Sequence, residues 1–149
     1  MVHHYTESGL DNVFIDGIRI ERDDDGDEVV TVPAINDLHR VIAEGIVLHG
    51  KGMSGAELRF LRTELGLTQA ELAQLVHRDK QSIGRWERGE IEFDPTAETL
   101  IRQLAIEKLE LKVEVGIGEL SQRSVPTAET QPISIVARNG GKDGYALAA

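Results

Sequence analysis

The sequence predicts a mainly helical α+β protein, in which a domain of four to five helices is flanked by small β-hairpin and helical segments. Three observations lead to this prediction. Apolar residues recur at helical spacing, between capping and terminating residues, over residues 54–109. Short apolar runs separated by Gly, Asp and Asn lie near both ends of the chain. A length of 149 residues allows one ordinary domain with appendages.

The composition excludes several classes of site. The chain has no cysteine, which rules out disulfides, thiol catalysis and cysteine-ligated zinc. No apolar stretch approaches the roughly 18 to 20 residues of a membrane span, and residues 1–11 lack the basic and apolar regions of a signal peptide. The sequence therefore predicts a cytoplasmic protein without a membrane partner.

Residues 1–50 are predicted to form a β-hairpin and a helix that serve dimerisation or interaction. Asp16-Gly17 lies between Val13-Phe14-Ile15 and Ile18-Arg19-Ile20, which is typical of a type I′ hairpin turn. The acidic run at residues 23–28 lacks the flanking helices and spaced Glu of a calcium loop, so a solvated turn is favoured. Val29 to Val32 is expected to be a short strand. Asn36 or Asp37 is then expected to cap a helix through about Leu48, with inward residues Leu38, Val41, Ile42 and Ile46.

Residues 51–110 are predicted to hold four helices with clear start signals. Ser54 with Glu57, and Thr68 with Glu71, form two capping boxes. The helix after Thr68 is expected to end near His77. Asp79 is expected to cap a helix over residues 80–88, and Asp94-Pro95 to start the fourth helix. The expected inward residues include Leu58, Leu61, Leu65, Leu72, Leu75, Val76, Ile83, Trp86, Ala97, Leu100, Ile101 and Leu104.

Residues 111–149 are predicted to be a linker followed by a hairpin. Residues 109–115 alternate apolar and charged side chains, which fits either a strand or the end of the fourth helix. Residues 119–132 are rich in Ser, Thr, Gln and Pro and are typical of a linker. The apolar runs Ile133 to Ala137 and Tyr145 to Leu147 flank a Gly-rich loop, which predicts a β-hairpin.

The net charge of -10 is unevenly distributed. Residues 1–50 carry 3 basic and 11 acidic side chains, whereas residues 51–92 carry 7 of each. Residues 78–88 contain four basic side chains and only two acidic ones. A locally positive surface is therefore compatible with the acidic total.

Residues 65–75 (LGLTQAELAQL) and residues 79–89 (DKQSIGRWERG) closely resemble the Cro/CI-type (XRE) helix-turn-helix family. The resemblance covers about residues 54–109 and implies double-stranded DNA as partner. It implies that Lys80, Gln81 and Arg85 read bases, that Gln69 holds a phosphate, and that Ile83 and Trp86 are core residues. Side-chain chemistry adds three further phosphate candidates, Arg78, Ser82 and Arg88. The sequence departs from the family pattern at His77, Arg78 and Gly84.

A second, more limited resemblance lies outside this domain. Residues 5–13 (YTESGLDNV) and residues 38–40 (LHR) are similar to the N-terminal region of regulators related to MqsA-type antitoxins. That family implies a dimer that represses its own operon. The cysteine-ligated zinc of MqsA is ruled out here because the chain has no cysteine. The remaining candidate metal ligands are His3 and His4 with Tyr5, or His39 with His49, but scattered surface histidines are commoner, so no metal is expected.

Two functions follow from these patterns. The first is a transcriptional regulator, a repressor or autorepressor, that acts as a homodimer on a palindromic operator and associates with the bacterial nucleoid. The alternative is an antitoxin-like module whose acidic first segment neutralises a basic toxin. A ligand-free helical bundle would bury the same leucines, but it leaves the basic face of residues 80–88 unexplained. No nucleophile and base pair stands out, so neither an enzyme nor a cofactor is expected.

Overall fold

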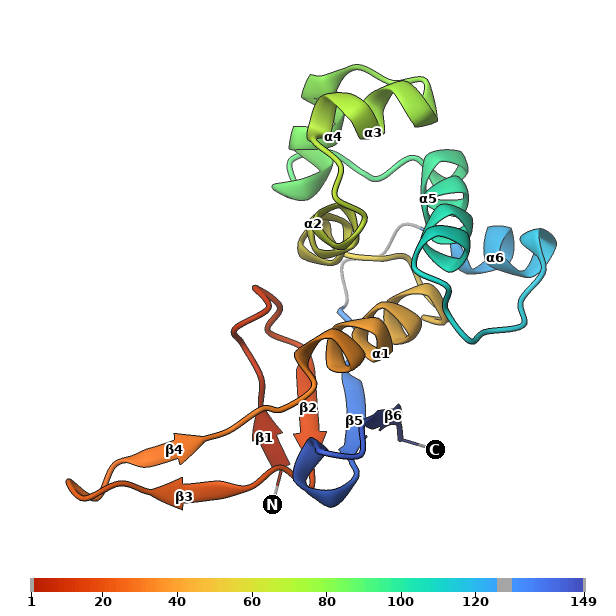
Figure 1. The fold of residues 1–149 in the computed structure, drawn as a ribbon. Helices are drawn as coiled ribbons and strands as arrows, with labels where there is room; N and C mark the ends of the chain where they lie inside the picture. The colour runs from red at the N-terminus through yellow and green to blue at the C-terminus, as the bar shows by residue number, and fades with distance from the viewer. Residues whose placement is uncertain (1, 126–129, 149) are drawn as a thin grey trace.

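The computed structural model describes residues 2–125 and 130–148, and in these ranges the chain forms six α-helices and two β-sheets. The predicted α+β class is confirmed. Figure 1 shows the helices α2 to α5 gathered at one end of the molecule and the larger sheet at the other, with α1 between them. None of the helices in these ranges has the length and apolar character needed to cross a membrane.

The larger sheet joins the two ends of the chain. Its strand order is β1 (Val2–His4), β2 (Val13–Asp16), β5 (Ile133–Ala137) and β6 (Tyr145–Leu147). β2 pairs antiparallel with β1 and parallel with β5, where Val13 lies opposite Ile133. The hairpin of β5 and β6 is confirmed, with the 3₁₀ turn η1 (Asn139–Gly141) in its connection.

The hairpin expected at Asp16-Gly17 is wrong. Both edges of β2 are occupied, by β1 and β5, so Ile18 to Ile20 has no position beside it. The chain leaves the sheet at Gly17, which has a φ of 93°. It forms a separate hairpin from β3 (Ile20–Arg22) and β4 (Glu28–Val30), which projects from the molecule in Figure 1. The acidic run forms the exposed turn of this hairpin, as predicted.

Helix α1 (Ile35–Val47) covers one face of the sheet. Its predicted inward residues Leu38, Val41, Ile42 and Ile46 are buried. The predicted cap is wrong, because Ala34 occupies the N-cap with a φ of 52° and no side chain caps the helix. The Asp37 carboxylate instead accepts a hydrogen bond from the Tyr145 backbone N–H and pairs with Arg40. Burial alone would raise the pKa of Asp37, but these two hydrogen bonds lower it overall.

Four helices form the predicted helical domain: α2 (Gly55–Glu64), α3 (Gln69–Val76), α4 (Lys80–Glu87) and α5 (Pro95–Lys108). Both capping boxes are present, and Asp79 and Asp94 cap α4 and α5 as predicted. The inward prediction is wrong for Leu75 and Leu100, whose exposed fractions are 47% and 40%. Both residues fit the apolar spacing but lie at the margin of a helix face that neighbouring helices do not reach.

The chain after α5 departs from prediction. Residues 111–116 are neither strand nor helix. Within the expected linker, α6 (Ile117–Arg123) forms and packs on α5, with Leu120 buried. Polar contacts also hold α6, since Arg123 donates to the Leu48 carbonyl oxygen and Arg102 donates to the Arg123 carbonyl oxygen. The part of the expected linker at residues 126–129 lies outside the described residues.

A buried polar network joins the helical domain to the rest of the molecule. Arg102 of α5 is fully buried and donates hydrogen bonds to the carbonyl oxygens of Val47, His49, Lys51 and Arg123. Beside it, burial raises the pKa of the Glu98 carboxyl, although the nearby Arg102 guanidinium opposes the shift. A guanidinium has five N–H donors, so this one side chain can donate hydrogen bonds to several carbonyl oxygens at helix ends and in loops.

The Glu57 carboxylate extends this network toward the sheet. It accepts hydrogen bonds from the His49 ring nitrogen at 2.6 Å and from the Asn12 side chain at 3.2 Å. Asn12 also donates to the Gln131 carbonyl oxygen. Since Glu57 lies in the first turn of α2, this network holds the start of α2 against the segments that precede β2 and β5.

Candidate nucleic-acid interface

The α3–turn–α4 unit is defined by local hydrogen bonds at each helix end. The Thr68 hydroxyl accepts from the Glu71 N–H at the start of α3, and the Glu71 carboxylate accepts from the Thr68 N–H. These hydrogen bonds lower the pKa of Glu71. At the start of α4, the Asp79 carboxylate accepts from the Ser82 N–H at 2.7 Å, which likewise lowers the pKa of Asp79. The helix boundaries are therefore set within a few residues of sequence.

The turn between these helices is short because His77 adopts a left-handed conformation. Its φ is 56° and its ψ is 44°. The following Arg78 N–H then donates to the Ala73 carbonyl oxygen at 3.0 Å, which closes the end of α3. Gly is common at this position in the Cro/CI-type family, and His can replace it here because it tolerates positive φ better than most residues.

The inner side of α4 anchors it in the domain. Ile83 is fully buried, and Trp86 is 5% exposed and stacks on Phe93, with ring centroids 4.8 Å apart. These two residues are the core positions that the family resemblance implied. Their burial fixes the orientation of α4, and with it the direction of the polar side chains on the other side of the helix.

Lys80, Gln81 and Arg85 are exposed on α4. Within the described residues, none of the three forms a side-chain hydrogen bond or an ion pair. Gln81 and Arg85 are four residues apart and so project from the same helix face. The outer surface of α4 thus presents two cations and an amide. Binding a ligand through these groups would break no side-chain hydrogen bond or ion pair of the described residues.

The phosphate candidates differ from the base-reading candidates, because three of the four already bond to other side chains of the protein. The Gln69 amide donates to Glu87, Arg78 pairs with Asp94 at 2.5 Å, and Arg88 pairs with Glu90 at 2.9 Å. The Arg88 contact raises the pKa of Arg88 and lowers that of Glu90. Ser82 is half-buried, with its N–H bonded to the Asp79 cap. Each bonded side chain has to exchange a protein partner for a phosphate.

Gly84 lies at the crossing of α3 and α4. A Cβ atom added there would lie 3.0 Å from a guanidinium nitrogen of Arg88 and 3.6 Å from the Gln69 side-chain oxygen. The missing side chain therefore leaves room for two of the phosphate candidates to lie beside α4. This is a structural reason for the departure from the family pattern that the sequence alone did not supply.

Sequence reasoning missed the residues that hold this unit together. Arg62 of α2 donates two hydrogen bonds to the Glu87 carboxylate of α4, and a third to the Leu67 carbonyl oxygen. Glu87 also accepts from Gln69 of α3, so one carboxylate of α4 bonds to two other helices. The sequence did contain one indication of this role. Glu87 directly follows the core residue Trp86 within the helix-turn-helix motif, which places it close to the buried side of the helix.

Three of the four histidines considered as metal ligands have hydrogen-bond partners. His4 bonds the Asp11 carbonyl oxygen, His39 bonds Glu64 and Tyr5, and His49 bonds Glu57. Among the residues that the structure describes, no three His, Asp or Glu side chains are grouped so as to hold a metal ion.

Comparison with known proteins agrees with this geometry. The family model described as Helix-turn-helix matches residues 58–106, which run from α2 into α5 and include all of α3 and α4. A search of curated proteins and a search of solved structures each gave no significant match. The resemblance to MqsA-type regulators outside the domain is not confirmed. Residues 58–106 are therefore similar to the helix-turn-helix family, in agreement with the resemblance to the Cro/CI (XRE) type.

Proposed function

We propose that the protein is a sequence-specific transcriptional regulator that inserts α4 into the DNA major groove. The observation that carries the proposal is the outer surface of α4, where Lys80, Gln81 and Arg85 are exposed and form no side-chain hydrogen bond or ion pair with the residues that the structure describes. Major-groove base edges are recognised by such side chains, since Gln can bind adenine and Arg or Lys can bind guanine through two hydrogen bonds. These three residues are the proposed base readers.

The proposed phosphate contacts are Gln69, Arg78, Ser82 and Arg88. Gln69 is the first residue of α3, where backbone N–H groups and the helix dipole favour an anion. Arg78 and Arg88 remain 44% and 59% exposed while paired with carboxylates. Since exposed ion pairs contribute little stability, these arginines can exchange a carboxylate for a phosphate at small cost.

We propose further that the protein acts as a homodimer on a palindromic operator and represses transcription there, including that of its own gene. Helix α4 has 8 residues, a length of about 12 Å, and touches only a few base pairs. Two copies spaced about 34 Å apart, one turn of DNA, would double the sequence that is read. Such a regulator works at the bacterial nucleoid, in the cytoplasm.

An antitoxin-like role is the second candidate, and the hairpin of β3 and β4 favours it. Every residue from 21 to 29 is exposed, and this stretch contains the acidic run. A projecting acidic hairpin is complementary to a basic protein such as a toxin. In this alternative, DNA binding is secondary to neutralisation.

The deciding experiment is footprinting on the DNA upstream of the protein's own gene, with wild type and the Arg85→Ala variant. We expect wild type to protect an inverted repeat and the variant to lose that protection at equal concentration. Wild type without a protected site, together with a one-to-one complex between the protein and the product of a neighbouring gene, would favour the antitoxin role.

A further inference from the structure

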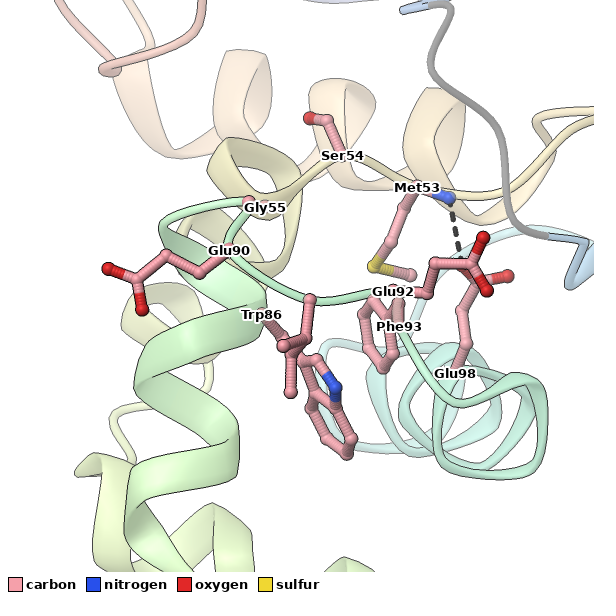
Figure 2. A pocket seen from close by; sticks show the side chains of 10 residues that line it. Met53, Ser54, Gly55, Trp86, Glu90, Glu92, Phe93 and Glu98 are labelled. Carbon is pink, nitrogen blue, oxygen red and sulfur yellow. Dashed lines mark hydrogen bonds between the residues drawn. The ribbon is translucent and has the colours of Figure 1, made fainter.

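A cavity of about 430 Å³ lies behind α4, on the side away from the proposed base readers. It is bounded by the start of α2, the end of α4, the loop at residues 89–93 and Glu98 of α5. Figure 2 shows this loop passing between Met53 and the aromatic residues Trp86 and Phe93. A volume in this range is typical of small-molecule sites.

The walls combine apolar surface with negative charge. Met53, Trp86, Ile91 and Phe93 supply the apolar part, and Ile91 is 43% exposed at the surface. Glu90, Glu92 and Glu98 supply carboxylates, whereas no Lys or Arg lines the cavity. The guanidinium groups that pair with Glu90 and Glu98 belong to Arg88 and Arg102, which lie outside the lining. Glu92 has no ion pair within the described residues.

Glu98 is the buried carboxylate of the cavity wall. One of its oxygens accepts a hydrogen bond from the Met53 N–H at 2.9 Å, and the other pairs with an Arg102 nitrogen at 3.4 Å. The charge of Glu98 is therefore balanced by Arg102, and Glu92 is the carboxylate of the wall that is open to a ligand.

The end of α4 adds a further negative potential. Gly89, which terminates α4, lines the cavity, and the last carbonyl groups of a helix carry partial negative charge. A positively charged group is therefore favoured by the helix end and by carboxylates, while an apolar body is favoured by the aromatic wall.

We propose that this cavity binds a small organic cation, an amine attached to an apolar body, and that the ligand regulates the position of α4. The ammonium group bonds Glu92, and the apolar body contacts Trp86, Phe93 and Ile91. The cavity and α4 share Trp86, so occupancy acts directly on the helix that carries Gln81 and Arg85. The proposed binding site is inferred from the cavity alone, whereas its regulatory effect rests on the proposed function.

Trp86 allows a direct binding test, because the chain has a single tryptophan. Phenethylamine is titrated into the full-length protein while tryptophan emission is recorded, and the neutral isostere 2-phenylethanol is titrated in parallel. We expect a saturable change with the amine and at least tenfold weaker binding of the alcohol. Equal affinities for the two compounds, or no saturation with the amine up to about ten millimolar, would overturn the proposed site.

The variant Glu92→Gln tests the carboxylate, with Glu114→Gln as its matched control. Glu114 is exposed and lies outside the cavity, so both variants change the net charge equally. We expect Glu92→Gln to weaken amine binding about fivefold or more and Glu114→Gln to leave it unchanged. The same affinity in both variants would show that the amine does not bind through Glu92 and would refute the assignment.

Regulation is tested by measuring DNA affinity with and without saturating phenethylamine. We expect at least a threefold change in wild type and none in Glu92→Gln at the same amine concentration. Saturated amine binding with unchanged DNA affinity would refute the regulatory effect. Absence of DNA binding in the amine-free measurement would instead count against the proposed function, so the two failures are distinguishable.

Discussion

Arg62 of α2 binds Glu87 of α4 through two hydrogen bonds, from Nε at 2.6 Å and from Nη2 at 3.1 Å. The pair is largely buried, with side-chain exposures of 16% and 5%. It lies on the face of α4 that contacts the domain, whereas Arg85 lies on the exposed face. The same short helix thus carries one charged residue that positions it and another that is free to bind.

Replacing Glu87 by Ala is expected to destabilise the protein by about 3 to 5 kcal/mol, because Arg62 would then be a buried charge without its partner. Urea unfolding measures this loss. Glu90→Ala removes a carboxylate whose ion pair is exposed, and it should leave the free energy of unfolding nearly unchanged. Similar losses in the two variants would contradict a structural role for Glu87.

Substitutions within the helix-turn-helix unit should separate base contacts from phosphate contacts. Arg85→Ala and Gln81→Ala are each expected to lose about 1 to 3 kcal/mol of binding energy on the operator and little on random DNA. Gln69→Ala and Arg88→Ala should weaken both by similar factors, because phosphates are alike at every base pair. Fluorescence anisotropy on both DNAs measures the difference. Unchanged operator affinity in a stable Arg85→Ala variant would exclude α4 as the reading helix.

DNA binding is expected to depend strongly on salt despite the net charge of -10. Each phosphate contact should contribute about -0.9 to the slope of log K against log salt concentration. Arg88→Ala should reduce the slope by about one contact, while Arg138→Ala should not, since Arg138 follows β5 at the other end of the molecule (Figure 1). A wild-type slope near zero would argue against nucleic acid as the partner.

Gly55→Ala tests the close packing of α2 on α4. A Cβ atom at this position would lie 2.4 Å from the carbonyl oxygens of Trp86 and Glu87. The two helices must therefore move apart, at an expected cost of about 1 to 3 kcal/mol and with weaker operator binding. Gly118→Ala is the control, because nothing lies within 4 Å of its added Cβ. Thermal unfolding of both variants would reveal an effect confined to Gly55, and equal melting temperatures would contradict it.

The cap of α4 predicts a pH dependence of stability. The Ser82 N–H bonds the Asp79 carboxylate and lowers its pKa from the ordinary value of 3.8. A carboxyl group whose pKa is lowered by folding stabilises the protein above its unfolded-state pKa, and this stability is lost as pH falls through the folded-state pKa. Asp79→Asn should therefore show a weaker loss of stability below about pH 4 than Asp24→Asn, which changes an exposed turn residue. Chemical unfolding at several pH values compares them, and identical pH profiles would count against this contribution of the cap.

The sequence by itself determined the helical domain, because the signals that start its helices act over three or four residues. Ser54 with Glu57 and Thr68 with Glu71 form the predicted capping boxes, and Asp79 caps α4 as predicted. The α4 face was predictable for the same reason, since helical spacing alone separates Ile83 and Trp86 from Gln81 and Arg85. The roles of the base and phosphate candidates remain predictions.

Only the tertiary structure decided how the chain ends meet and which polar groups are buried. β2 pairs with β5 across about 120 residues, and this pairing displaced the hairpin expected at Asp16-Gly17. Asp37 lies within the first turn of α1 and not at its N-cap, and its carboxylate accepts a hydrogen bond from Tyr145 N–H, 108 positions away in the chain. Arg102 is fully buried because four irregular carbonyl oxygens converge on it. These outcomes depend on contacts between segments far apart in the chain, and local spacing carries no information about which distant partner will be present.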